Sequence, residues 1–421
     1  MTNGFAHSLT EPVLPVGRFG DQTPFGDPYW YQGLNSPYYD ATHLAWREKC
    51  RKFVDAEILP FVDEWEEAGV QPPGLLKKLS DHGLLSAVFP RDVGGQPPES
   101  FDIFHELILI DEMARCGSWG VIMGCYGIMT MALPPVIIGC RPAVRDRVAR
   151  ACVAGDKQIG LAISEPWAGS DVAAMRTEAR REGDFYIVNG QKKWITNAVN
   201  ASFFTLACRT GNVGKGGVSL LLVERDTPGI KIEKMKLQGN WTAGTGIVTL
   251  EDVRVPAENL IGEENKGFKM IVKNFNHERF VIAAVATRAA RVCLEESVRH
   301  AQRRKTFGKR LADHQVIRHK LADMARAVES LQAWLELVAY QMKTGAPDET
   351  VGQMTALIKA HASKVYKQIA LEACQVLGGI SYVRGGNGAK VERAVREVVS
   401  ASIPGGSEEI MLDLGMDLAK I

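Results

Sequence analysis

The chain has 421 residues, of which 46% are hydrophobic and 24% charged, a composition typical of a globular protein with two or three domains. Fifty basic against forty-nine acidic side chains leave a net charge of +1, which provides no long-range field to attract nucleic acid or an anionic membrane. No apolar run approaches the roughly eighteen to twenty residues that span a bilayer. The eight cysteines lack the spacing of a zinc site or a disulfide framework. We therefore expect a soluble intracellular protein without a metal ion, nucleic acid or membrane partner.

The two ends of the chain differ in composition from the rest. Residues 1–40 are rich in Pro, Gly and aromatic residues and carry a single basic residue, Arg18, so they resemble neither a secretory signal nor an Arg-rich transit peptide. They predict an extended arm that packs through its aromatic side chains onto its own domain or a neighbouring subunit. The chain ends in Ala-Lys-Ile, a loose variant of the Ser-Lys-Leu peroxisomal address. We expect a cytoplasmic location, and this ending leaves the peroxisome as the alternative location.

The periodicity of apolar residues divides the remaining sequence into three parts. Residues 41–157 have helical spacing and predict an N-terminal helical domain. Residues 158–264 contain seven short strand-like segments and predict a middle β-barrel or sandwich domain, with Asn189-Gly190 as a hairpin turn. From residue 265 to 421, long helical segments near 268–303, 314–343 and 350–377 and two shorter ones predict a C-terminal helical bundle. The fold class is therefore α+β.

Two segments of the middle part have the features of a ligand site. The sequence LAISEPWAGSD at 161–171 starts as a strand and opens into a loop of small residues, where the backbone can approach a flat ligand closely. The second segment, QKKWITN at 191–197, brings a bulky ring, Trp194, and a hydroxyl, Thr196, to the same pocket. A Trp in a strand is most often a core residue, and this remains the alternative for Trp194.

These segments resemble the flavin signature of the acyl-CoA dehydrogenases. Ser164–Asp171 corresponds to the family's Thr/Ser-Glu-Pro-x-Ala-Gly-Ser-Asp, and Trp194–Asn197 to its Trp-Ile-Thr-Asn. Three later family motifs have counterparts in the right order at 303–315, 374–379 and 405–410. The resemblance extends from about residue 41 to the C-terminus. It implies an FAD cofactor, an acyl-CoA substrate, a homotetramer built as a dimer of dimers, and the same order of helix, sheet and helix.

The resemblance also indicates where the catalytic base lies. Enzymes of this family remove a proton from Cα and a hydride from Cβ of an acyl thioester, which requires a carboxylate base and donors at the thioester oxygen. The medium-chain type has its basic Glu at the position of Gly405, which cannot accept a proton. The isovaleryl and long-chain types have it on the first long C-terminal helix, immediately before a substrate-binding Arg, where this chain has Glu278 and Arg279. We predict Glu278 as the base, against the alternative of an ordinary surface ion pair on its helix.

Further roles follow from the same resemblance. The N–H of Gly405 is expected to donate to the thioester oxygen, while Arg279, Asn276 and Gly406 contact the substrate. Ser164 is expected at the flavin ring edge, and Ser170 near the pantetheine or phosphate of CoA, although a turn-forming Ser explains Ser170 nearly as well. The remaining residues implied to bind the cofactor are Leu161, Ile163, Gly169, Trp194, Ile195, Thr196, Arg304, Thr306, Phe307, His314, Gln315, Gln375, Gly378, Gly379, Ser407 and Glu409.

Three of these expectations concern longer stretches. The element around Arg304–Phe307 is implied to reach the FAD across a subunit interface, although a solvated basic helix end is the commoner explanation of such a charge run. Gly378-Gly379 alone would be explained as a helix C-cap. Small and soft residues between Gly120 and Met131 are expected to line the acyl tunnel, with Pro134-Pro135 breaking the helix that follows.

The resulting functional hypothesis is FAD-dependent α,β-dehydrogenation of a long-chain or branched acyl-CoA to the trans-2-enoyl-CoA. An electron-transferring flavoprotein or dioxygen would accept the electrons, and use of dioxygen would make the protein an acyl-CoA oxidase. A substrate carried by acyl carrier protein is a second alternative. A third is a non-catalytic relative that binds flavin and nucleic acid, against which the balanced charge and the Glu278-Arg279 pair argue.

Overall fold

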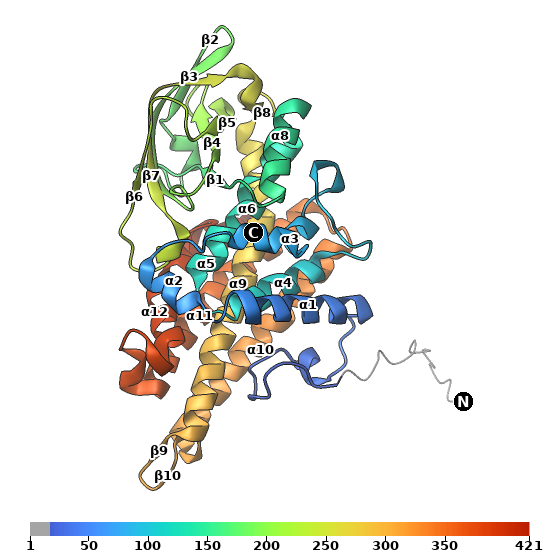
Figure 1. Ribbon diagram of the computed structural model, residues 1–421, viewed down its shortest axis with the longest axis vertical. Coiled ribbons are helices and arrows are strands. Elements are labelled where there is room, and N and C mark those ends of the chain that lie inside the picture. Colours follow the sequence, from blue (N-terminus) through green and yellow to red (C-terminus); the bar gives the residue numbers. More distant parts are fainter. Residues whose placement is uncertain (1–16, 421) are drawn as a thin grey trace, which may run out of the picture.

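The computed structural model describes residues 17–420. Residues 1–16 of the expected arm and Ile421 of the C-terminal tripeptide lie outside the described residues. A sheet domain occupies one end of the long axis, and long helices run from it to the opposite end (Figure 1). The N-terminal helices pack against the middle of this axis, so the order along the chain is helices, sheet and helices.

The N-terminal part is helical, as predicted. Asp40 and Asp102 start α1 and α4, which pack against each other, because each side chain accepts backbone N–H groups in a capping box. The break predicted at Pro134-Pro135 lies at Leu133, and the next helix begins with Pro at its first position. The helices are α1 (Ala41–Glu57), α2 (Val62–Ala68), α3 (Leu75–Asp81), α4 (Ile103–Ala114), α5 (Trp119–Ile122), the π-helix η4 (Met123–Gly127), α6 (Ile128–Ala132), α7 (Pro134–Gly139) and α8 (Pro142–Val153).

The expectation that no apolar run approaches the length of a membrane span is wrong for this region. The helical run Trp119–Gly139 has 21 residues and a mean hydropathy of 1.9, so by length and composition it could cross a membrane. No charged residue interrupts this run in the sequence. In the structure 83% of its most apolar window is buried inside the protein. It is a core layer under α4 and the long helix α9 (Gly267–Arg303).

The described part of the N-terminal arm packs onto its own chain. Trp30, Tyr31 and Tyr39 are buried. Asp27 lies between two buried guanidinium groups, with Oδ1 2.8 Å from Nη2 of Arg51 and 3.1 Å from Nη2 of Arg288. The arm is therefore fastened by ion pairs as well as by aromatic packing, to α1 and to the long helix α9.

The middle part is an eight-stranded sheet with the order β6-β7-β3-β2-β4-β5-β8, in which β1 pairs with β4. The Asn189-Gly190 hairpin prediction is wrong. β3 continues through both residues, because the long strand β7 pairs with it from Phe185↔Pro256 to Ile195↔Gly246. The strands are β1 (Ile159–Ala162), β2 (Glu178–Glu182), β3 (Phe185–Ile195), β4 (Phe203–Arg209), β5 (Val218–Glu224), β6 (Ile230–Lys234), β7 (Gly246–Pro256) and β8 (Leu260–Ile261).

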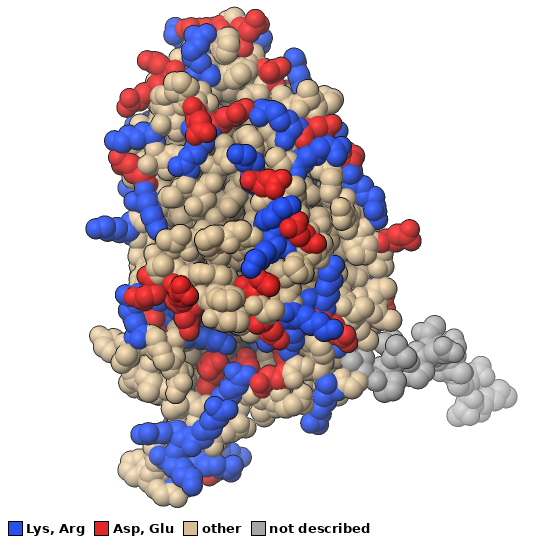
Figure 2. All heavy atoms as spheres, viewed as in Figure 1, with Lys and Arg blue, Asp and Glu red and all other residues tan. Residues whose placement is uncertain are grey.

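The C-terminal part is a helical bundle, as predicted. Its helices are α9 (Gly267–Arg303), α10 (Gln315–Lys343), α11 (Asp348–Leu377), α12 (Ala389–Ser402) and α13 (Glu408–Leu418). The short strands β9 (Lys305–Thr306) and β10 (Lys309–Arg310) form a hairpin between α9 and α10 that protrudes from the end opposite to the sheet (Figure 1). Basic side chains gather at this tip (Figure 2), supplied by Arg303, Arg304, Lys305, Lys309 and Arg310.

Candidate functional site

The carboxylate of Glu278 is buried in the body of the protein. It lies on α9, and only 7% of the residue is exposed. Its Oε2 atom has no hydrogen-bond partner within the described residues. Burial raises the pKa of Glu278 to about 7, although Arg279, Lys359 and His277 each lower it. A buried carboxylate with a free oxygen and a pKa near neutrality has the properties of a general base.

The loop between α12 and α13 faces this carboxylate. Gly405 has a left-handed backbone, with φ of +67°, and a Cβ placed on it would lie 3.6 Å from Oε1 of Glu278. The two positions at which the family carries its base therefore lie side by side. The N–H of Gly405 donates to no acceptor that we find in the described part of the chain, so it is available to an oxygen of a ligand.

Arg279 connects α9 with the loop between α12 and α13. Its Nε donates to the carbonyl of Gly405 at 3.2 Å, and its Nη1 donates to Oδ1 of Asn276 at 3.3 Å. The predicted substrate residues Arg279, Asn276 and Gly406 thus come together with Glu278 and Gly405. The alternative interpretation of Glu278, a surface ion pair on its helix, is not what the structure shows, because this carboxylate is buried and forms no salt bridge in the described residues.

The two predicted flavin segments of the middle domain also lie together, and a buried ion pair joins them. Lys192 on β3 is fully buried, and its Nζ lies 2.9 Å from the carbonyl of Ile163 and 2.8 Å from Oε1 of Glu165. Glu165 in turn accepts the backbone N–H groups of Arg176 and Thr177 at 2.6 and 2.9 Å. Burial alone would raise the pKa of Glu165, but Lys192 and these donors lower it. This pair was not predicted from the sequence.

Trp194 does not lie in the core. Its backbone is left-handed, with φ of +60°, at a register shift in the pairing of β3 with β7, and 47% of the residue is exposed. This conformation is costly for a large side chain and tends to be kept at functional sites. Ile195 beside it is buried, and Thr196 is half-buried. In the first segment Leu161 and Ser164 are half-buried, Ile163 is buried, and Gly169 and Ser170 are exposed, with open space where a Cβ on Gly169 would point.

The predicted cofactor residues between Arg304 and Gly379 lie at the other end of the molecule. Arg304, Thr306, Phe307, His314 and Gln315 belong to the protruding tip. Phe307 is 96% exposed, and Thr306 Oγ1 lies 3.1 Å from Nε2 of His314. Since Lys320 pairs with Glu372, α11 brings Gln375, Gly378 and Gly379 to this same end. One chain therefore does not gather all predicted cofactor residues around one ligand (Figure 1).

Ser407 and Glu409 start the last helix. Oγ of Ser407 accepts the N–H of Ile410 at 3.4 Å and caps α13. Glu409 is exposed, and hydrogen bonds from its own N–H and from Ser407 lower its pKa. Both residues have a complete structural explanation as an N-terminal cap. Their position directly after Gly406 also keeps them beside the candidate site.

A polar network next to Glu278 was missed in the sequence. Nε2 of His277 lies 3.0 Å from both carboxylate oxygens of Glu106, and the hydroxyl of Tyr126 donates to Oε1 of Glu106 at 3.0 Å. Burial alone would lower the pKa of His277, but Glu106 raises it. Tyr126 belongs to the π-helix, a rare conformation often found at functional sites. Because the three residues come from α4, η4 and α9, only the fold reveals the network.

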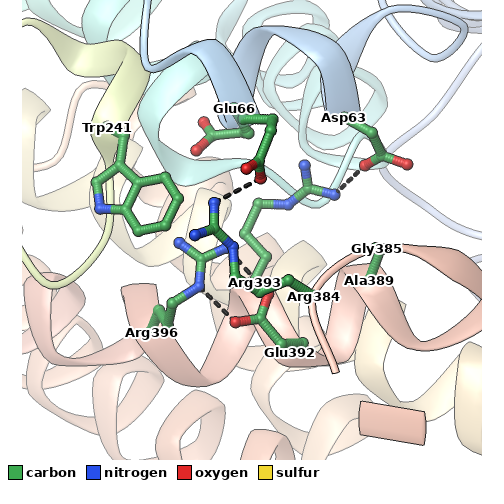
Figure 3. A pocket seen from close by; sticks show the side chains of 10 residues that line it. Asp63, Glu66, Trp241, Arg384, Gly385, Ala389, Glu392, Arg393 and Arg396 are labelled. Atoms are coloured by element: carbon green, nitrogen blue, oxygen red, sulfur yellow. Dashed lines mark hydrogen bonds and ion pairs between the residues drawn. The ribbon is translucent and has the colours of Figure 1, made fainter. Parts of the chain in front are cut away.

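An open hollow lies between α2, α12 and the loop that carries Trp241 (Figure 3). Arg393 pairs with Asp63, and the guanidinium carbon of Arg396 lies 4.1 Å from the ring centroid of Trp241. Charges of both signs cancel one another here, and none of the predicted site residues line the hollow. It is a seam that fastens the N-terminal helices to α12, the helix that leads to the Gly405 loop.

Glu397, a buried carboxyl group on α12 near this seam, should make the stability of the protein depend on pH. Burial and the nearby Glu66 raise the pKa of Glu397. The folded state therefore retains a proton that the unfolded state releases above pH 4.5, and this contribution to stability is lost as the pH rises. We expect Glu397→Gln to raise the Tm by a few degrees at pH 8 and to change it little at pH 5, as measured by calorimetry. Glu99→Gln, at an exposed position, is the control; an equal shift at both pH values would contradict the assignment.

A second cluster has the composition of a metal site. Ligand atoms of His43, Asp102 and His105 lie within 4.8 Å of one another. Both imidazoles contact Oδ1 of Asp102, at 3.1 and 3.0 Å, and Nζ of Lys343 lies 2.6 Å from Oδ2. Asp102 and His105 also form the capping box of α4. The cluster is thus explained as the junction of α1, α4 and α10.

Comparison with known proteins covers nearly the whole chain. Residues 40–156, 160–253 and 265–417 match the N-terminal, middle and C-terminal domains of acyl-CoA dehydrogenases. An acyl-CoA dehydrogenase of Alternaria alternata is 38% identical over 416 residues, which cover 94% of this chain and 96% of the relative. A cyclohexane-1-carbonyl-CoA dehydrogenase of Syntrophus aciditrophicus is 34% identical and covers 86% of this chain and 92% of its own length. The structure of butyryl-CoA dehydrogenase from Megasphaera elsdenii superposes with a TM-score of 0.85 at 26% identity, over 92% and 100% of the two chains.

Proposed function

The chain belongs to the acyl-CoA dehydrogenase family and is an FAD-dependent oxidoreductase, and from this premise we propose that it oxidises a long-chain or branched acyl-CoA to the trans-2-enoyl-CoA with Glu278 as base. The observation that carries the proposal is the buried carboxylate of Glu278, whose Oε2 has no hydrogen-bond partner within the described residues and whose Oε1 lies 3.6 Å from a Cβ placed on Gly405. A relative named for a ring-bearing acyl group supports a bulky acyl substrate. The position of the base supports the isovaleryl and long-chain type.

The residues present fit the cofactor. Trp194 is held half-exposed by a left-handed backbone, and open space lies beside Gly169, Gly378 and Gly379 where a Cβ would point. The side chain of Arg304 has no hydrogen-bond or ion-pair partner that we find between residues 17 and 420, which leaves its guanidinium available for a pyrophosphate. Ser164, Thr196, Trp194 and the tip residues would hold the cofactor. When bound, FAD accepts the hydride that leaves Cβ.

Residues of this chain remove the proton from Cα, donate to the thioester oxygen and hold the loop that carries Gly405. The deprotonated carboxylate of Glu278 takes the proton from Cα, and its neighbourhood excludes water because the side chain is buried. The N–H of Gly405 donates to the thioester oxygen, where negative charge develops as the proton leaves. Arg279 holds the carbonyl of Gly405, and so fixes the direction of this loop. Asn276 orients Arg279 from one turn earlier on α9.

Anaerobic titration with a panel of straight, branched and ring-bearing acyl-CoA thioesters tests the proposal. We expect at least one thioester to bleach the flavin absorbance, and the rate across the panel defines the acyl preference. Bleaching by no thioester would reject the dehydrogenase function and favour a binding protein of the same fold. The same panel on acyl carrier protein separates the two carriers.

The electron acceptor needs a separate experiment. We propose an electron-transferring flavoprotein, as is consistent with the family, with dioxygen as the alternative. Stopped-flow reoxidation of the reduced protein, in air and with the flavoprotein, distinguishes them. Rapid release of hydrogen peroxide would identify an oxidase.

We further propose that the protein is a homotetramer in the cytoplasm, with the peroxisome as the alternative location. The separation of the tip residues from the middle-domain segments supports an assembly in which a second copy completes each cofactor site. Sedimentation and imaging of an N-terminally tagged fusion test these two proposals.

Replacing Arg304 with Ala should weaken retention of FAD. Its exposed guanidinium lies at the base of the protruding hairpin, and loss of a charge-assisted contact to a phosphate costs affinity. We expect at least a tenfold higher dissociation constant for FAD, measured by reconstitution of the apoprotein. Arg326→Ala, at an exposed position on α10, is the control. Unchanged FAD affinity in Arg304→Ala would remove the tip from the cofactor site.

A further inference from the structure

A buried lysine holds the loop that faces Glu278. Lys359 lies on α11 among buried residues and is itself 0% exposed. Its Nζ donates to the carbonyl of Ser402 at 3.0 Å and to the carbonyl of Gly406 at 2.6 Å. These two carbonyls stand on either side of Gly405. The ammonium therefore fixes both ends of the segment whose backbone the proposed reaction uses.

Neighbouring contacts show that this segment is held throughout. Oγ of Ser363, one turn along α11, donates to the carbonyl of Ala401 at 2.8 Å. Nε of Arg279 donates to the carbonyl of Gly405 at 3.2 Å. Carbonyls at the end of a helix lack partners within that helix. Donors from α9 and α11 meet the carbonyls at the end of α12 and in the loop that follows it. These carbonyls are hydrogen-bonded within the protein, whereas the N–H of Gly405 has no acceptor in the described residues and is available to a ligand.

The surroundings of Lys359 are charged on both sides. Glu278 and Arg279 face it from α9, and Glu408 and Glu409 from α13. Burial lowers the pKa of Lys359 to about 8, and Glu278 opposes this change. In return, the charge of Lys359 lowers the pKa of Glu278, together with Arg279 and His277. The lysine thus acts on the base through its charge and on the loop through its hydrogen bonds.

We propose that Lys359 is a positioning residue for the dehydrogenation. It holds the loop 402–406 in the conformation that places the backbone of Gly405 against Glu278. This role rests on the proposed function and extends it to a residue on a third helix. Nothing in the sequence motifs points to it, because Lys359 stands in an ordinary helical pattern.

The test compares the wild-type holoprotein with three variants in anaerobic stopped-flow reduction by the best acyl-CoA of the panel, with the pH varied. Lys359→Met removes both the charge and the donors, and Lys359→Arg keeps the charge. Lys367→Met, exposed on the same helix, is the matched control. We expect Lys359→Met to lower the limiting rate of reduction about 10- to 100-fold, the range for a displaced reacting group. The dissociation constant of the acyl-CoA should change much less.

The pH profile separates this role from a merely structural one. Without the ammonium, the pKa of Glu278 should rise, so the acidic limb of the rate should move to higher pH in Lys359→Met. Lys359→Arg should restore the position of the limb but only part of the rate, because its planar fork differs in shape from an ammonium. If Lys359→Met does not accumulate with bound flavin, Lys359→Gln, which keeps a donor without charge, is measured instead.

Wild-type rate with an unmoved acidic limb in the uncharged variant would overturn the proposal. The proposal would also be overturned if Lys359→Met were slow but its acidic limb stayed at the wild-type pH, and if Lys359→Arg were no faster than Lys359→Met. Both results require that the wild-type protein is reduced by an acyl-CoA. Failure of the wild-type protein to be reduced rejects the proposed function itself, so the two failures are distinguishable.

Discussion

Replacing Glu278 with Gln should leave a yellow protein that binds acyl-CoA but is reduced by it at least about 100-fold more slowly, within the range expected for loss of a general base. The amide has nearly the shape of the carboxylate and cannot accept the proton of Cα. The site is compatible with the change, since Oε2 of Glu278 has no partner in the described residues that the new group would lose. Anaerobic stopped-flow absorbance of the flavin measures the rate.

The pH dependence of the wild-type protein provides a second test of Glu278 as the base. Because the base acts when deprotonated, and burial raises the pKa of Glu278 to about 7, kcat/KM should fall as the pH drops through this value. Glu349→Gln, at an exposed position at the start of α11, should leave the rate unchanged. If Glu278→Gln is reduced at the wild-type rate, the base lies elsewhere, and Glu408 and Glu409 are the acids to replace next.

The long elements were predictable because their patterns are local. The helices α9, α10 and α11 begin and end within a few residues of the predicted segments, since apolar side chains recur at helical spacing over many turns. The hairpin at Asn189-Gly190 failed for a non-local reason. A two-residue turn of the expected type needs positive φ at both residues, but only Gly190 has it, and pairing with β7 keeps both halves of β3 in one strand.

The candidate base and its surroundings were predictable only through motif positions. Glu278, Arg279 and Gly405 come together in the structure although 126 residues separate Arg279 from Gly405. Lys359 and the pair Glu165–Lys192 could not be assigned in this way. A charged residue in a helix or strand is usually solvated, and no pattern along the chain shows that these side chains turn inward. Their partners are mostly backbone carbonyls and N–H groups of distant loops, which side-chain identities do not encode.

The ion pair between Lys192 and Glu165 should be the most sensitive point for stability of the flavin segments. Both residues are fully buried, and Nζ of Lys192 meets the carbonyl of Ile163 as well as Glu165. Lys192→Met leaves the carboxylate buried without its counter-charge, which typically costs about 3–5 kcal/mol. We expect a marked fall in Tm together with loss of FAD, because the loop from Ile163 to Ser170 and the strand with Trp194 lose their connection.

Matched variants show whether the pair itself is responsible. Lys231→Met removes an exposed lysine from β6 of the same sheet and should leave the Tm and the flavin content unchanged. The double variant Glu165→Gln/Lys192→Met removes both charges, and we expect it to be more stable than Lys192→Met alone, since no unpaired buried charge remains. Thermal unfolding and the ratio of flavin to protein absorbance measure both quantities. A double variant less stable than the single one would mean that the hydrogen bonds of Glu165 to Arg176 and Thr177, and not the ion pair, hold the loop.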